Sequence, residues 1–157
     1  MPLYWVTHAS AVASPATATF DAIELVVATG IIRVQRVYLY QTSDLGDAAE
    51  EVVRTEWIRG HTTSGSGGQT TVITPLNPFD AAATFTAETI NTTIASAGTG
   101  LSLAPMGWNV RIPFDMIYPP GAEIVARATT AQDRIVFRIS GQADALTLNA
   151  ACLVEQL

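Results

Sequence analysis

Apolar and polar residues alternate along most of this 157-residue chain, which indicates β-strands rather than helices. In residues 134–139, three apolar side chains, Ile135, Phe137 and Ile139, share one face, and two arginines lie on the other. A similar alternation runs over residues 145–154. Further strands are predicted at residues 20–28, 31–41, 52–59, 70–74, 84–91, 108–114 and 123–128. About nine strands predict an all-β fold, either an antiparallel two-sheet sandwich or a barrel.

Glycine and proline residues fall between the apolar segments, where turns are expected. Glycine allows positive φ, and proline fixes the entry to a turn. At most one short helix is predicted, at residues 44–53, where Ser43 or Asp44 would cap an acidic, alanine-containing turn. The turns themselves are predicted at residues 29–30, 64–68, 97–100, 119–121 and 140–141.

The first part of the chain, residues 1–19, differs from the rest. Leu3, Tyr4 and Trp5 precede a stretch rich in Ala, Ser and Pro that is poorly suited to a self-contained core. Two interpretations remain open: an arm that packs on another subunit or adds a strand to its sheet, or an ordinary first strand followed by a loop. No repeat or change of composition marks a second domain, so residues 20–157 are expected to form one sandwich domain.

Composition argues against several classes of function. A hydrophobic fraction of 48% supplies a genuine core, whereas a net charge of -6 leaves no basic surface for nucleic acid. All eight cationic residues are arginines, which are enriched at protein interfaces, although an arginine-rich codon usage explains them equally well. No window approaches the roughly 20 apolar residues of a membrane span, and no basic region precedes an apolar signal core. We therefore expect a soluble protein without a classical export signal.

The glycine-rich segment at residues 60–78 reads GHTTSGSGGQTTVITPLNP and invites comparison with phosphate-binding loops. A P-loop needs a lysine, which the chain lacks, and Thr70 occupies the place of the third glycine of a dinucleotide fingerprint. No helix pattern follows that could hold an anion. We predict instead a mobile, uncharged hairpin loop that reaches beyond the sandwich. Candidate contacts with another protein chain in and beside this loop are Arg59, His61, Ser64 and Gln69.

Catalytic constellations are absent from the sequence patterns. His8 and His61 lie outside metal-binding motifs and are predicted to be solvated loop residues. Ser64, His61 and Asp80 formally supply a triad, but no G-x-S-x-G elbow occurs. Carboxylates on predicted strands are expected to face water or to pair with arginines across strands. These carboxylates are Glu24, Glu56, Glu88 and Glu123.

The remaining candidates also favour structural roles. Cys152 is predicted to be a small buried hydrophobe, and a single cysteine supplies neither a disulfide nor a metal cluster. Asn91 begins a glycosylation pattern that we interpret as a turn. Three tryptophans either form a sugar-stacking platform or, with greater weight, pack in the core or between subunits. They are Trp5, Trp57 and Trp108. No catalytic, cofactor-binding or metal-binding residue is predicted.

Four phrases and the closing LVEQL resemble a group of small proteins encoded near the capsid genes of tailed bacteriophages and prophages. The phrases are WIRGHTTSGSGG at residues 57–68, FTAETINTT at 85–93, WNVR at 108–111 and ADALTL at 143–148. This resemblance implies a jelly-roll-like virion structural protein, a decoration or cement protein. Such a protein is not an enzyme, is made in the bacterial host cytoplasm, and binds the major capsid protein as a homotrimer on the capsid surface.

Two function hypotheses follow from the sequence. In the first, a cement protein clamps neighbouring capsid subunits through an N-terminal arm that carries Leu3, Tyr4 and Trp5 and through loop residues 61–69. In the second, the same sandwich is carried on a head or tail fibre and recognises host glycans through exposed Trp or Tyr. An enzymatic interpretation has the least support, because no convergent carboxylates or histidines can be assembled from spacing.

Overall fold

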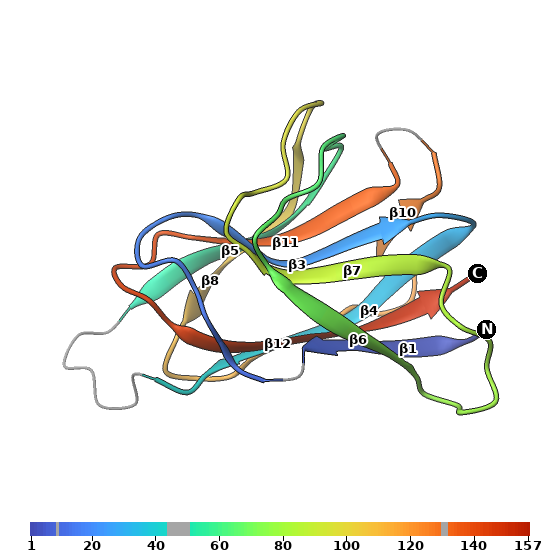
Figure 1. Ribbon diagram of the computed structural model, residues 1–157, viewed down its shortest axis with the longest axis horizontal. Coiled ribbons are helices and arrows are strands. Elements are labelled where there is room, and N and C mark those ends of the chain that lie inside the picture. Colours follow the sequence, from blue (N-terminus) through green and yellow to red (C-terminus); the bar gives the residue numbers. More distant parts are fainter. Residues whose placement is uncertain (9, 44–50, 130–131) are drawn as a thin grey trace.

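The computed structural model describes residues 1–8, 10–43, 51–129 and 132–157, and these residues form strands but no helix. The all-β prediction is confirmed (Figure 1). The described residues include no helix that is long and apolar enough to cross a membrane. The strands are β1 Leu3–His8, β2 Val12–Ala13, β3 Phe20–Val27, β4 Ile31–Gln41, β5 Val52–Arg59, β6 Gln69–Pro75, β7 Phe85–Asn91, β8 Leu101–Asn109, β9 Phe114–Ile117, β10 Ile124–Arg127, β11 Arg134–Ser140 and β12 Thr147–Gln156.

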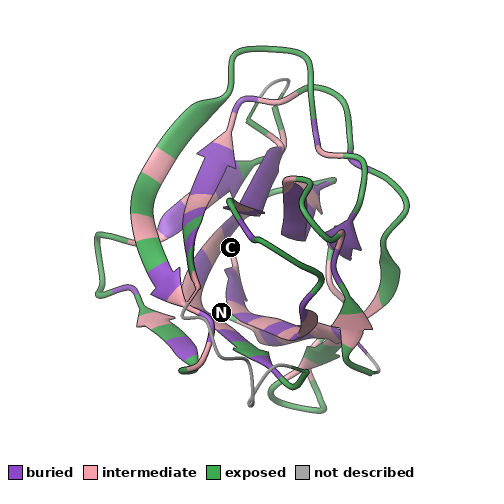
Figure 2. Ribbon diagram, turned by 90° about the vertical axis from the view of Figure 1, so that its left-hand side faces the viewer, coloured by how far each residue is buried: buried purple, intermediate pink, exposed green. Residues whose placement is uncertain are grey.

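The strands fold into a two-layered, barrel-like antiparallel sandwich (Figures 1 and 2). The first half has the order β1–β12–β4, with β9 and β10 both on the far side of β4. The second half has the order β3–β11–β5–β8. This is a jelly-roll-like arrangement, as predicted, in which most connections carry the chain from one half to the other. Strands β6 and β7 are an additional pair that joins the halves, since β6 pairs with β1 and β7 with β3.

Most predicted strand bounds agree with the structure. The predictions at residues 31–41 and 52–59 coincide with β4 and β5. The strand predicted at residues 108–114 is wrong, because this segment contains the end of β8, a corner and the start of β9. Sequence pattern missed most of β8 because this edge strand pairs only with β5 and is largely exposed on both faces. It also contains Pro105, which an edge strand tolerates.

The predicted helix at residues 44–53 lies mostly outside the described residues. Its last two residues, Val52 and Val53, form the start of β5, so the predicted C-terminal end of the helix is wrong. The predicted turn at residues 29–30 is present, and Gly30 adopts a φ of 79° where the chain leaves β3 for β4 in the opposite half. That left-handed conformation favours glycine.

The N-terminal residues form an internal strand rather than an arm. Strand β1 lies between β12 and β6, and its register pairs Val6 with Cys152 on one side and with Ile73 on the other. Tyr4 and Val6 are fully buried. The ordinary-first-strand interpretation is therefore correct for residues 3–8, and the arm interpretation is wrong there, because these side chains complete the core of their own chain.

Aromatic side chains from both halves meet in the core. The ring centroid of Phe137 on β11 lies 5.0 Å from that of Trp57 on β5 and 5.6 Å from that of Phe114 on β9. The indole Nε1 of Trp57 donates a hydrogen bond of 2.8 Å to the hydroxyl of Tyr118, just after β9. Burial raises the pKa of that hydroxyl above its ordinary value. Buried and exposed positions alternate along several strands (Figure 2), as expected for a two-layered sandwich.

The bond between Trp57 and Tyr118 offers a test of this packing. In Tyr118→Phe, the buried indole N–H loses its acceptor, so we expect the free energy of unfolding to fall by about 1–3 kcal/mol. Urea unfolding followed by tryptophan fluorescence measures it. The control is Tyr38→Phe, which removes a hydroxyl without a hydrogen bond among the described residues and should change stability by less than about 0.5 kcal/mol. Equal losses in the two variants would contradict the assignment.

Candidate functional site

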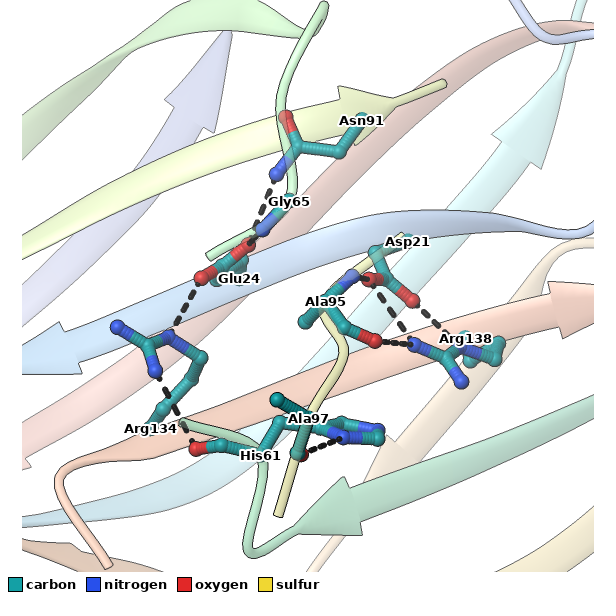
Figure 3. A network of polar contacts seen from close by, with 9 residues as sticks. All are labelled: Asp21, Glu24, His61, Gly65, Asn91, Ala95, Ala97, Arg134 and Arg138. Carbon is teal, nitrogen blue, oxygen red and sulfur yellow. Dashed lines mark hydrogen bonds and ion pairs between the residues drawn. The ribbon is translucent and has the colours of Figure 1, made fainter. Parts of the chain in front are cut away.

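Two loops lie side by side over the outer face of β3 and β11, at residues 60–68 and 92–100 (Figures 1 and 3). Backbone hydrogen bonds join them at two places. Ser66 and Thr93 exchange bonds of 2.9 Å, and Thr63 and Ser96 exchange bonds of 2.9 and 3.0 Å. The first loop is therefore not the hairpin that the sequence predicted, because β5 and β6 do not pair and the loop pairs with a distant segment instead.

A bulge in β3 turns two carboxylates toward these loops. Asp21 and Glu24 are three residues apart, so regular alternation would place them on opposite faces of the sheet. The register with β11 shifts by one residue between the Phe137–Ile23 and Arg138–Asp21 pairs. Such a bulge re-aims the side chains beyond it. Both carboxylates consequently lie on the outer face, on the same side as the arginines of β11 (Figure 3).

Glu24 organises the first loop. Its carboxylate accepts hydrogen bonds from Arg134 Nε at 2.8 Å, the backbone N–H of Gly65 at 2.9 Å and the side-chain amide of Asn91 at 2.9 Å. The same arginine donates from Nη1 to the carbonyl of His61 at 3.2 Å. Glu24 is almost fully buried and Arg134 nearly so. This buried ion pair thus holds the loop at two points (Figure 3).

Asp21 holds the second loop in a parallel way. Arg138 donates to its two carboxylate oxygens at 2.6 and 3.2 Å, and the N–H of Ala95 donates to it at 2.6 Å. Arg138 Nη2 also donates to the Ala95 carbonyl at 3.0 Å. Burial raises the pKa of Asp21, while Arg138 and the Ala95 N–H act in the opposite direction. The carboxylate therefore depends on both partners to stay ionised.

The loops cover a small second core and approach each other closely. Ile58, Ala95 and Val136 form a buried apolar cluster beneath them. A Cβ on Gly65 would lie 2.6 Å from the carbonyl oxygen of Thr93, which is closer than side chains tolerate. The glycines of this segment therefore permit close backbone packing. The expectation of a free, mobile loop is wrong for this reason.

The predicted contact residues do not form one site. Leu3 and Trp5 are half-buried on β1, in the first half of the sandwich. Tyr4 is fully buried, and its ring packs edge-on against Phe85. Its hydroxyl donates a hydrogen bond of 2.8 Å to the carbonyl oxygen of Ala81. Tyr4 is thus unavailable for a contact. The others lie over or beside the outer face of the second half, and of these Arg59 and His61 are half-buried while Ser64 and Gln69 are exposed.

The formal triad is not assembled. His61 places Nδ1 3.2 Å from the carbonyl oxygen of Ala97 in the loop pair. Asp80 lies instead in the connection between β6 and β7, where the amide of Asn77 donates to it at 3.4 Å. The described part of the chain brings no three His, Cys, Asp or Glu side chains together as a metal site.

Four further residues singled out in the sequence are buried. Cys152 is fully buried, as predicted, and burial raises the pKa of its thiol. Trp57 and Trp108 are core residues, and Trp108 Nε1 donates to the carbonyl of Ile112 at 2.7 Å. Asn91 is fully buried against Glu24, so its amide is not an exposed acceptor for a glycan in the folded protein.

His8 is buried, so the prediction of a solvated histidine is wrong. Its Nε2 accepts a hydrogen bond of 2.8 Å from the backbone N–H of Ala150. Nδ1 lies 2.5 Å from the carbonyl oxygen of Ser10 and therefore carries the proton of a neutral ring. Burial lowers the pKa of His8, with the Ser10 contact acting in the opposite direction. The ring replaces a backbone partner at the end of β1 and has no free nitrogen for catalysis.

An exposed apolar tip is the feature that sequence reasoning missed. The connection between β6 and β7 carries Phe79, which is 94% exposed, and Leu76, which is 56% exposed. It lies at the same end of the sandwich as both termini (Figure 1). The Asn77-Pro78-Phe79 sequence was a detectable signal, because a turn-forming pair ahead of an aromatic residue presents that residue at the surface.

The tip is held in a defined conformation. The side-chain oxygen of Asn77 accepts a hydrogen bond of 3.2 Å from the backbone N–H of Phe79. The backbone carbonyl of Asn77 accepts one of 3.0 Å from the N–H of Asp80. The base is tied to β1, since the N–H of Leu76 donates to the carbonyl of Leu3 at 2.7 Å. The Phe79 ring is thus presented on an anchored turn.

No protein-family model matches the chain, and no curated protein matches it.

The Glu24–Arg134 pair predicts a large effect on stability. In Arg134→Met, the carboxylate keeps its burial but loses its cation, so we expect the free energy of unfolding to fall by about 3–5 kcal/mol. The control is Arg36→Met, which removes a well-formed but solvent-exposed pair with Asp115 and should lower stability far less, because water screens that pair. Chemical denaturation measures both. Similar losses would show that burial of the first pair does not matter.

The neutral state of His8 predicts a dependence of stability on pH. Because burial lowers the pKa of His8 below its ordinary 6.5, the unfolded chain takes up a proton at higher pH than the folded chain. Stability should therefore fall as the pH decreases below about 6.5. In His8→Gln this part of the slope should disappear. Urea unfolding between about pH 7 and pH 5 measures the slopes, and parallel curves for the two proteins would contradict the assignment.

Proposed function

We propose that this protein is a structural component of a phage virion, a decoration or cement protein that binds the major capsid protein and stabilises the shell. The sequence phrases that resemble phage proteins support this proposal. The jelly-roll-like sandwich suits it, because a two-layered fold with extensive strand pairing provides a rigid body for attachment. The proposed location is the capsid surface, and the proposed assembly is a homotrimer.

The observation that carries the proposal is the anchored apolar tip. A fully exposed phenylalanine on a fixed turn loses little conformational entropy when it binds, so more of its burial energy contributes to affinity. Aromatic residues are enriched in protein interfaces and supply many of the contacts that dominate binding. Phe79 and Leu76 therefore form the best surface for a protein contact among the described residues.

The tip replaces the N-terminal arm as the proposed attachment point. Tyr4 is buried and cannot reach a partner, whereas Leu3 lies at the base of the tip through its bond to Leu76. An apolar contact here suits a chain that has few charges for ionic docking, with 14% charged residues. The loop pair at residues 60–68 and 92–100 remains available as a second contact, because Thr62, Thr63 and Ser64 are exposed.

Binding to shells that lack this protein tests the proposal. Phe79→Ser removes the exposed ring without touching the core, so folding should be unchanged and affinity for shells should fall at least about tenfold. The control is Ile117→Ser on β9, which removes a 64% exposed isoleucine outside both the tip and the loop pair and should bind normally. Cosedimentation of purified protein with undecorated shells measures affinity, and circular dichroism confirms folding.

A second measurement tests the stabilising role. Shells decorated with the wild-type protein should retain DNA to a higher temperature than bare shells, and shells mixed with Phe79→Ser should behave like bare shells. Equal retention in all three preparations would overturn the cement role, and normal binding by Phe79→Ser would move the contact away from the tip.

The second candidate is a glycan-binding module on a head or tail fibre. One observation favours it: two tyrosines line a surface pocket on the first half of the sandwich, and none of the described residues around it is charged. That pocket is compatible with a cement protein as well, because it lies on a different part of the molecule from Phe79.

A further inference from the structure

A shallow pocket opens on the outer face of the first half, between β1, β12 and β4. Its volume is about 200 Å³, and Thr7, Tyr38, Tyr40, Asn149 and Ala151 line it together with the end of β1. It is smaller than most pockets for drug-sized ligands, so it suits a single small ring rather than an extended molecule. None of these side chains belongs to the apolar tip or to the loop clamp, by which we mean the Glu24–Arg134 and Asp21–Arg138 pairs that hold the two loops.

The strand register explains why the surface is hollow here. Ala151 on β12 pairs with Thr7 of β1 on one side and with Tyr38 of β4 on the other. One row further along, Asn149 pairs with Tyr40. A methyl group therefore forms the floor between longer neighbours, with the tyrosines as one wall and β1 as the other.

The tyrosine wall offers an aromatic surface to a ligand. The ring centroids of Tyr38 and Tyr40 lie 5.6 Å apart with an interplanar angle of 53°. Tyr40 is 37% exposed, and it lies beyond β9, which pairs with β4 only as far as Leu39. An aromatic ring of this kind combines apolar contact area with a polar hydroxyl.

The pocket also holds unused hydrogen-bonding groups. The hydroxyls of Thr7, Tyr38 and Tyr40 and the amide of Asn149 form no hydrogen bond to any described residue. They include donors and acceptors on both walls. His8 at the end of β1 adds none, because Ala150 and Ser10 occupy its two nitrogens.

Among the residues that the structure describes, no charged side chain lines the pocket. The nearest charges in register belong to Asp115, which pairs with Tyr38 across β9 and is neutralised by Arg36 through bonds of 2.6 and 2.7 Å. The Arg36 guanidinium lowers the pKa of Asp115, so both groups stay ionised and are hydrogen-bonded to each other. The described lining therefore offers no charged group with which to select an anion or a cation.

We propose that this pocket binds one neutral sugar ring, with an apolar ring face on Tyr40 and Tyr38 and with hydroxyls bonded to Asn149 and Thr7. Neutral saccharides are the ligands that combine an apolar ring face with many hydroxyls and no charge. A small, open pocket predicts a weak complex, with a dissociation constant of about 1–10 mM. The inference concerns the isolated protein and does not depend on attachment to a shell.

Titration of 15N-labelled protein with neutral monosaccharides tests the proposal. The probes are glucose, galactose, mannose and N-acetylglucosamine, and glucuronate serves as the charged comparison. We expect saturable amide shifts at Asn149, Ala151 and Thr7 with at least one neutral probe and weaker binding of glucuronate. Tyr40→Ala and Asn149→Ala should each weaken that binding at least about tenfold, whereas Tyr40→Phe, which keeps the ring, should weaken it less.

Phe79→Ala is the matched control, because it removes an exposed aromatic ring outside the pocket and should leave sugar affinity unchanged. Thermal melting verifies that each variant folds. The proposal is overturned if no neutral probe gives saturable shifts at about 100 mM, if the shifts map elsewhere, or if Tyr40→Ala binds like the wild type. Any of these results leaves shell binding through Phe79 unaffected, so the two proposals fail separately.

Discussion

Two carboxylates buried on the outer face of β3, Asp21 and Glu24, are the constraint on which the covering of the second half of the sandwich depends. An ionised carboxylate is costly to bury unless a cation and hydrogen-bond donors surround it. The arginines of β11 supply the charge, and backbone N–H groups of two loops supply the remaining donors. Satisfying the carboxylates therefore also fixes the loops. The loops in turn require glycine where their backbones meet.

The clamp also accounts for local strain. Ile90 adopts a φ of 55°, which is unusual for a β-branched residue and costs on the order of 1–3 kcal/mol. The next residue, Asn91, donates its amide to Glu24 inside the clamp. We infer that the contacts of Asn91 offset the strain of Ile90, because the strained backbone at Ile90 directly precedes the buried hydrogen bond from Asn91 to Glu24. Strain of this kind persists only where surrounding contacts over-determine the backbone.

The two outer faces of the sandwich consequently differ. Loops held by ion pairs cover part of the second half (Figure 3), whereas the first half presents a sheet surface with two tyrosines, a threonine and alanines around a pocket. The apolar tip occupies the end of the molecule near the termini (Figure 1). Rigid presentation is common to the tip and the pocket, since both are built on paired strands or anchored turns. The two surfaces proposed for binding therefore lie on separate parts of one framework.

The alternation of apolar and polar residues determined the all-β class, the bounds of strands such as β4 and β5, and the burial of Cys152, because a strand's two faces are encoded locally. Only the tertiary structure decided the rest. A bulge opposite Phe137 set the direction of the β3 carboxylates, and a distant backbone N–H made His8 a buried, neutral group. The exposure of Phe79 depended on how its turn is anchored to β1. Pairing between segments far apart in sequence determines these three features, and a local sequence pattern does not show which distant segment it will pair with.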